Sequence, residues 1–517
     1  MKKITIFLTS ILFFTGFCYC SVIKETEQLG RLLESGRFEA AERKINEVKE
    51  PALKLYWQSL LSFYNGKYRD AYGEIESALS YKGSEQKWES LKNYYYFISE
   101  ISYNFQESAS EHFRVRAMNQ DVVLSKYALE TLEKMYQKTG LEFGFLPKSK
   151  VLVEIYQNKR DFSIASTLSE EILDKTGTVG ICKFNRLMII SPQSLPLGYS
   201  WLDTLCHEYV HFMVNSLSGG KCPLWLHEGI ARYYETAWRT DTYEFLSKAG
   251  EQKLKEAKDK NAFISFERMS PSLVYLKNQD EIMLAFSEVA SAVDFMRKNY
   301  GSDIVAKLLK NIDISNEKEA FKNSLGGSRN KFENLWLNYV KTLDLKAHPG
   351  VVVDEVNFSK KSEDEFVGTD AKGYIRLGDK MREIERYDAA LIHYNKALDV
   401  EPSNPVILLK IARTQLKLGN KQEAEEKLKS AIEKNPHYVT PFQDLSKLYF
   451  DENEIDKCME ISLRSLAINP FYPETHKYLY KCYLSKNDLD NALYEIRASV
   501  VLNPNDIDSK VILDRLK

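Results

Sequence analysis

Residues 205–213 read Leu-Cys-His-Glu-Tyr-Val-His-Phe-Met, and this stretch decides the fold expected for the middle of the chain. His207 and His211 are four positions apart, so on an α-helix both imidazoles lie on one face and can bind the same tetrahedral metal ion. Glu208 follows the first histidine and can reach a water molecule at the ion's remaining position. The apolar residues around the histidines are those of a buried helix. A surface helix with two incidental histidines is the alternative.

A second segment lies downstream, at 223–235, and reads Pro-Leu-Trp-Leu-His-Glu-Gly-Ile-Ala-Arg-Tyr-Tyr-Glu. Together the two segments resemble the zinc helices of the gluzincins, the peptidase MA-like metallopeptidases, in which a Trp-Leu-x-Glu-Gly segment supplies the third ligand. The resemblance implies that Glu228, with 16 residues between it and His211, completes a Zn²⁺ site with His207 and His211. It covers about residues 110–345 and implies an α+β, thermolysin-like domain.

The resemblance also implies a reaction, the hydrolysis of peptide bonds by zinc-activated water. Glu208 would act as the general base and pass the proton to the leaving amine. The family often stabilises the oxyanion with a downstream tyrosine, but Phe286 stands in the corresponding helix of this sequence. Tyr233, Tyr275 and Tyr300 are the alternatives, and the sequence favours none of them.

Two more residues beside the motifs are candidates for a role in the site. His227 is adjacent to Glu228 but about 100° further round a helix, so we expect it not to bind the same ion. It either contacts substrate or supports the fold. Asp203 lies four residues before His207 on the same helix face. It either accepts a hydrogen bond from the ring nitrogen that the metal does not use, or caps the helix N-terminus.

Short apolar or alternating runs predict the strands of a small sheet. These runs are 112–116, 151–156 and 181–190, and an amphipathic helix is expected over 122–138. The aminopeptidase branch of the family carries an acidic Gly-x-Met-Glu-Asn segment on the strand beside the zinc helix. The comparable stretch here, 180–192, contains no acidic residue. This difference disfavours an aminopeptidase and favours an endopeptidase that pairs the substrate backbone with an edge strand.

Four prolines near the C-terminal end recur at a spacing of 34 residues, at Pro402, Pro436, Pro470 and Pro504. This period, with small residues at matching positions, resembles the tetratricopeptide repeat (TPR), in which each unit is a pair of helices. Residues 369–517 are therefore expected to form an all-α array that binds a protein partner or acts only as a spacer. Fainter Gly-x-aromatic-x-x-Ala echoes predict degenerate helical hairpins over 21–105.

The N-terminal residues and the net charge limit the compartments and the kinds of partner that are expected. Lys2 and Lys3 before a short apolar run predict a removable signal peptide over 1–20, so the protein is expected to be periplasmic or secreted. Lipid anchoring at Cys18 or Cys20 is less favoured and is the one route to a membrane. Lys+Arg 71 against Asp+Glu 73 gives a net charge of -2, which argues against nucleic-acid binding. The expected order is signal peptide 1–20, helical region 21–105, zinc domain 106–345, linker 346–368 and repeats 369–517.

The sequence leaves two functions open. The first is an exported zinc endopeptidase that hydrolyses protein or peptide substrates, with the repeats recruiting the substrate or a protein partner. The second is a non-catalytic interaction protein in which the repeats bind partners and the zinc domain is structural or inactive. The intact Glu208 favours the enzyme, since a structural site needs no base, whereas Phe286 favours the interaction protein.

Overall fold

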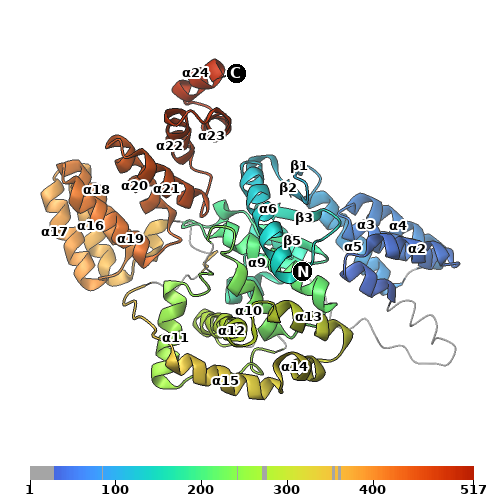
Figure 1. Cartoon of the computed structure of the whole chain (residues 1–517). Helices are drawn as coiled ribbons and strands as arrows, with labels where there is room; N and C mark the ends of the chain where they lie inside the picture. The colour runs from blue at the N-terminus through green and yellow to red at the C-terminus, as the bar shows by residue number, and fades with distance from the viewer. Residues whose placement is uncertain are drawn as a thin grey trace.

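A computed structural model describes residues 28–516, apart from positions 84, 241–242, 271–275, 352–355 and 359–361. The expected signal peptide (1–20) and Tyr275 lie outside the described residues. None of the helices in these described ranges is both long enough and apolar enough to cross a membrane. The described chain is mostly helical around one small sheet (Figure 1).

The N-terminal region is a row of helices that begins with residues 28–34. The helices that follow are α2 (Phe38–Glu47), α3 (Pro51–Tyr64), α4 (Tyr68–Lys82) and α5 (Gln86–Ile101). Gly36 and Gly66 have φ values of 68° and 77°, the left-handed conformation that glycine adopts without cost, and each lies in a turn between helices. Ala41 and Ala71 are fully buried where paired helices meet. These are the helical hairpins that the sequence predicts.

The sheet has five strands in the order β1-β2-β3-β5-β4. Their bounds are β1 Gln106–Ala109, β2 Phe113–Ala117, β3 Val151–Tyr156, β4 Gly180–Lys183 and β5 Arg186–Ile190. The three central strands are parallel, with Val115 opposite Val153 and Val153 opposite Leu187, and the two outer strands run antiparallel. Every residue of β3 and β5 is buried, as expected for parallel strands covered on both faces.

The prediction of one strand over 181–190 is wrong, because the structure has a hairpin there. Phe184 and Asn185 both have positive φ, 55° and 56°, so they form a two-residue turn between β4 and β5. Asparagine tolerates this conformation, and its presence in the apolar run was the available signal. The turn places β4 at the edge of the sheet.

The central region contains most of the remaining helices. They are α6 (Val123–Phe143), α7 (Lys159–Ser166), α8 (Glu170–Thr176), α9 (Trp201–Ser218), α10 (Leu224–Tyr234), α11 (Lys248–Lys260), α12 (Gln279–Tyr300), α13 (Ile304–Ile314), α14 (Glu317–Leu325) and α15 (Arg329–Thr342). Short 3₁₀ turns described in the structure are η1 (Asn119–Asp121) and η2 (Pro192–Ser194) in this region and η4 (Glu363–Phe366) in the linker. Helix α6 continues one turn past the predicted end at 138 and stops at Gly144, which is left-handed.

The two faces of the sheet are covered by different parts of the chain. Leu187 and Ile189 of β5 pack in the core that contains α6 and α9. Met188 and Ile190 point the other way and pack with α4, α5 and α7. The N-terminal helices thus cover one face, and the helix with the histidine motif covers the other.

The C-terminal array consists of helix pairs. Its helices are α16 (Thr369–Glu383), α17 (Tyr387–Val400), α18 (Pro405–Leu418), α19 (Lys421–Lys434), α20 (Val439–Asp451), α21 (Ile455–Leu466), α22 (Pro473–Ser485), α23 (Leu489–Leu502) and α24 (Ile507–Leu516). Each of the four periodic prolines follows the second helix of a pair. At Gly378 a Cβ atom would lie 2.4 Å from the ring of Tyr394, so the first pair needs glycine there.

The array docks directly on the central region. The indole Nε1 of Trp201, the first residue of α9, donates to the Leu466 carbonyl at 2.8 Å. The backbone N–H of Val439 donates to the Leu197 carbonyl, in the loop that leads to α9. The array and the N-terminal helices lie on opposite sides of the central region (Figure 1). The start of the histidine helix is therefore held by the repeats.

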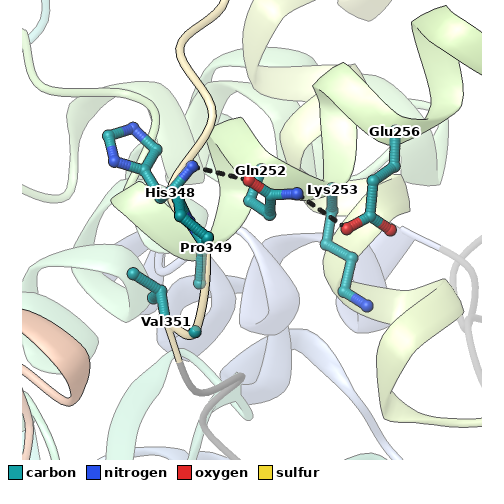
Figure 2. A pocket seen from close by; sticks show the side chains of 8 residues that line it. Gln252, Lys253, Glu256, His348, Pro349 and Val351 are labelled. Carbon is teal, nitrogen blue, oxygen red and sulfur yellow. Dashed lines mark hydrogen bonds between the residues drawn. The ribbon is translucent and has the colours of Figure 1, made fainter. Parts of the chain in front are cut away.

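The expected linker is anchored where it leaves the central region. The backbone N–H of His348 donates to Gln252 Oε1 of α11 at 2.6 Å, and its ring Nε2 lies 2.6 Å from Glu251. Figure 2 shows the small pocket formed between α11 and His348–Val351. On the side of the array, Lys434 of α19 donates to the Pro349 carbonyl at 3.0 Å.

Candidate metal centre

Helices α9 and α10 carry the histidine motif and the downstream glutamate. Helix α9 has Asp203 in its first turn, where the helix dipole stabilises a carboxylate. The helix ends at Gly219, which adopts the left-handed conformation. Helix α10 begins directly after Pro223. In α10 a Cβ atom on Gly229 would lie 2.7 Å from the Val289 carbonyl, so only glycine lets α10 pack this closely on α12.

The tryptophan of the downstream motif holds α10 in place by packing against buried aromatic rings. Trp225 is fully buried, and its ring stacks on Phe266 with centroids 4.2 Å apart. Phe332 packs beside the same ring. The indole therefore fixes the turn of α10 that carries Glu228.

The two helices bring His207, His211 and Glu228 together. One ligand atom from each of these three residues lies within 4.8 Å of the others. Glu228 Oε2 is 3.4 Å from His207 Nε2 and 3.4 Å from His211 Nε2. The predicted ligand residues thus form a single cluster, and in the described part of the chain it is the one group of this kind.

The spacing of the donor atoms fits a small tetrahedral ion. Bonds of about 2.0–2.1 Å in tetrahedral geometry hold ligand atoms roughly 3.3–3.4 Å apart. The two measured distances from Glu228 match this value. Two imidazole nitrogens and one carboxylate oxygen are also a donor set that zinc uses in catalytic sites. The residues present therefore fit a zinc ion.

The electrostatics of the cluster favour a cation. Burial alone would raise the pKa of Glu228, but His211 and His207 lower it well below its usual range, so the carboxylate is ionised. Burial alone would lower the pKa of His207, but hydrogen bonds to Glu228 and Glu235 outweigh it and raise this pKa to about 10. The two carboxylates thus stabilise positive charge on the His207 ring.

Glu235 is the site residue that the sequence analysis missed. Its Oε2 atom lies 3.0 Å from His207 Nδ1, and its carboxylate also accepts from Arg232 Nη1 at 2.8 Å. A carboxylate bound to Nδ1 fixes the proton there and leaves the Nε2 lone pair for the metal. Glu235 stands seven residues, or two helical turns, after Glu228, and this spacing was the available signal.

Both roles predicted for Asp203 are wrong. Its carboxylate accepts from Trp238 Nε1 at 2.8 Å and from Arg239 Nη2 at 3.0 Å, not from His207. The N-cap position of α9 is Ser200, and the helix has no side-chain cap. The four-residue spacing put Asp203 on the correct helix face, but Glu235 from α10 and its continuation reaches His207 instead.

Glu208 lies in a buried position beside the sheet. It is 5% exposed, and burial raises the pKa of its carboxyl above the ordinary value despite the nearby His211 and His207. A Cβ atom on Gly180 of β4 would lie 2.9 Å from Glu208 Oε1 and 2.7 Å from Thr204. The glycine therefore lets the edge strand pass directly alongside the carboxylate.

His227 does not join the ligand cluster, as its place on α10 predicted. Its Nε2 atom lies 3.0 Å from Asn215 Oδ1, and its ring stacks on His211 with centroids 4.3 Å apart. Burial, and then the nearby His211, lowers the pKa of His227 to about 3, so the ring is neutral at pH 7. His227 thus packs against the His211 ring, and its contact with substrate stays a prediction.

The two predicted oxyanion donors that the structure describes, Tyr233 and Tyr300, pack away from the cluster. Tyr233 is buried among Tyr243, Phe245 and Arg297, and Tyr300 packs against Phe295 at the far end of α12. Phe286, which replaces the tyrosine of the family, does lie at the site. The Phe286 ring meets the His207 ring edge-on, with the two centroids 6.3 Å apart. The Arg232 guanidinium carbon lies 5.1 Å from the centroid of the Phe286 ring.

Comparison with known families places the central region. Residues 127–342 match the Peptidase MA superfamily. This match confirms the resemblance drawn from the two motifs, so this part of the chain is a Peptidase MA domain, and it is combined with TPR helix pairs. No curated protein matches the chain.

Some solved structures resemble a part of the chain. A MamA structure is 24% identical over 28% of this chain and 85% of its own, with a TM-score of 0.26. PilF of Pseudomonas aeruginosa is 17% identical over 30% of this chain and 69% of its own, with a TM-score of 0.27. YrrB, described as a TPR protein with an unusual peptide-binding site, is 18% identical over 28% and 75%, with a TM-score of 0.26. No conclusion about this chain rests on these overlaps.

Proposed function

We propose that the protein is an exported zinc-dependent endopeptidase whose TPR array recruits a protein substrate or partner. The observation that carries the proposal is the convergence of His207, His211 and Glu228 with the buried Glu208 beside them. The basic and apolar first residues support export. The thermolysin-like topology implied by the motifs belongs to the same proposal.

The ligand residues define what the metal would contribute. A zinc ion held by His207, His211 and Glu228 would supply Lewis acidity that polarises a peptide carbonyl and lowers the pKa of water towards about 7. Glu235 holds the proton on Nδ1 of His207 and keeps Nε2 directed at the site. Arg232 in turn orients the Glu235 carboxylate through two hydrogen bonds.

Glu208 would move the proton in this reaction. The carboxylate would take a proton from the attacking water and deliver it to the amine that leaves when the peptide bond breaks. Because burial raises its pKa, the protonated form needed for the second transfer is more accessible than for an exposed glutamate. A buried base beside the metal ligands is what this reaction requires and what a purely structural site does not.

The edge strand offers a place for the substrate backbone. Ile190 N–H donates to the Val179 carbonyl, so alternate residues of β4 turn their polar groups toward β5. Gly180 and Cys182 lie between these residues, so their backbone polar groups point away from β5, at the free edge. Glu208 meets this edge, because its carboxylate accepts a hydrogen bond from the Cys182 backbone. An extended peptide paired with this edge would pass the general base, as an endopeptidase needs.

One observation favours the second function, a non-catalytic interaction protein. Phe286, which stands where the family's tyrosine is expected, contacts the His207 ring and has no hydrogen-bond donor for the oxyanion. In this alternative the metal domain is structural or inactive and the repeats bind the partner.

Cleavage of a mixed peptide library, followed by mass spectrometry, separates the two functions. We expect the zinc-loaded protein to cut internal bonds and Glu208→Gln to lose about 10²–10⁴-fold in rate while retaining zinc. Glu171→Gln, which changes an exposed glutamate of α8, is the matched control and should retain the wild-type rate. Absence of cleavage by all three zinc-loaded proteins would favour the interaction protein.

A further inference from the structure

The first helices of successive repeat pairs carry a chain of charged side chains. Lys410 of α18 bonds Asp379 of α16 at 3.2 Å, and Arg413 of α18 bonds Asp444 of α20 at 2.5 Å. The Lys410 side chain is only 13% exposed. Tyr438 and Thr440, at the start of α20, are buried beside this row. We call Lys410, Arg413, Tyr438 and Thr440 the cationic face.

A segment of the chain's own linker lies on the cationic face. The 3₁₀ turn η4, Glu363–Phe366, packs against α18. The two oxygens of Glu363 accept separate hydrogen bonds, Oε2 from Tyr438 at 2.6 Å and Oε1 from Thr440. Both donors are hydroxyls on buried residues, so they form a defined seat for one carboxylate.

The next residue of the segment binds the same face. Asp364 Oδ1 lies 3.1 Å from Lys410 Nζ. Two adjacent carboxylates are thus bonded by one lysine and two hydroxyls.

The segment comes directly before α16, but its carboxylates bind residues of α18 and α20 instead. Helix α16 begins at Thr369, directly after the segment, whereas the partners of Glu363 lie 75 and 77 residues further along the chain on α20. A segment that only started α16 would not need carboxylates on α18 and α20. The seat binds two adjacent carboxylates across the first helices of the array, and the linker supplies them.

We propose that Glu363–Phe366 is a displaceable internal ligand of the cationic face. The face then takes an acidic peptide with two adjacent carboxylates, from a partner or a substrate protein, in place of the linker. This interaction does not depend on the peptidase activity. Val439 of α20 donates to the Leu197 carbonyl in the loop before α9. Replacement of the linker by a peptide therefore occurs next to the contact that holds the start of α9.

Fluorescence anisotropy with a labelled peptide of residues 362–368 tests the exchange on the full chain. Glu363→Gln with Asp364→Asn should free the face and bind the peptide roughly tenfold more tightly than wild type, which must first release its own segment. Adding Lys410→Ala and Thr440→Val should abolish this gain. Adding Lys396→Ala, an exposed lysine of α17, should leave it unchanged, and a peptide with Gln and Asn at the acidic positions should not bind.

Hydrogen exchange of the wild type gives a second readout that requires no substitution. Excess peptide should speed amide exchange in residues 362–368, because the internal segment is displaced. The proposal is overturned if the freed variant is folded but binds no more tightly than wild type. It is also overturned if the peptide binds without changing exchange in the segment, or if binding survives the loss of Lys410 and Thr440.

Discussion

His207 and His476 each have a glutamate carboxylate within hydrogen-bond distance of Nδ1, but the two histidines differ in what their Nε2 atoms contact. His207 in α9 pairs with Glu235 at 3.0 Å, and its Nε2 atom faces Glu228 among the clustered ligands. His476 in α22 pairs with Glu495 at 2.6 Å, and its Nε2 atom is bound to the Pro470 carbonyl at 2.7 Å. The second nitrogen therefore distinguishes them, since one is available to a metal and the other is used by the protein.

The surroundings reinforce this difference. Glu495 also accepts from Tyr127 of α6 at 2.9 Å, so the His476 pair joins the repeat array to the Peptidase MA domain. His476 is fully buried and Glu495 nearly so. Glu235 is tied instead to Arg232 on the same helical stretch, beside the ligands. A histidine–carboxylate pair with both ring nitrogens bonded thus joins the two domains, whereas a pair that leaves Nε2 facing the ligand cluster would orient a metal ligand.

The largest expected effect comes from removing either histidine. His207→Ala should lose bound zinc, from about one ion per chain to near none, because a three-residue site cannot hold the ion with two ligands at ordinary affinity. His476→Ala should retain the zinc. Elemental analysis after dialysis measures both, and equal zinc loss in the two variants would erase the distinction.

For the stability of the fold, we expect the larger effect at His476. His476→Ala should lower the free energy of unfolding by about 3–5 kcal/mol, because Glu495 is left buried without its partner. Urea denaturation of the zinc-free protein measures it, with His393→Ala in α17 as the control, since Nδ1 of His393 has no partner among the described residues. A change below about 1 kcal/mol for His476→Ala would show that the pair does not hold the domains together.

The carboxylates sharpen the comparison at smaller magnitude. Glu235→Gln should weaken zinc binding about 10–100-fold, because the amide no longer holds the His207 ring in the correct tautomer. Glu495→Gln should leave zinc affinity unchanged and lower stability. Competition with a fluorescent chelator gives both affinities, and an unaltered affinity in Glu235→Gln would remove Glu235 from the site.

The smallest effect is expected at Asp203. Asp203→Asn should change zinc affinity by less than about threefold, because the carboxylate bonds Trp238 and Arg239 rather than His207. It should lower stability by about 1–2 kcal/mol through the loss of charged hydrogen bonds. A tenfold loss of zinc affinity would restore the role that the sequence first suggested.

The sequence predicted what depends on spacing within one element. The four-residue interval between His207 and His211 sets both rings on one helix face, whatever surrounds that helix. The 34-residue period likewise predicted the helix pairs of the array. Glu228 required the family resemblance, because nothing within α9 specifies which later helix approaches it.

What the sequence did not reveal depends on contacts between elements. The bond from Glu235 to His207 joins residues 28 positions apart, and its competitor Asp203 was equally well spaced along α9. The hairpin at Phe184 and Asn185 needed backbone conformations that an apolar run conceals. The seat of Glu363 on α20 joins residues more than 70 apart, which no local pattern encodes.

A zinc-soaked crystal of the full chain, measured at the zinc absorption edge, tests the metal site most directly. We predict one strong anomalous peak, about 2.0–2.2 Å from Nε2 of His207, Nε2 of His211 and a carboxylate oxygen of Glu228. We predict no peak at His476, whose nitrogens are both bonded. A peak elsewhere, or none at the three ligands in zinc-saturated crystals, would contradict it.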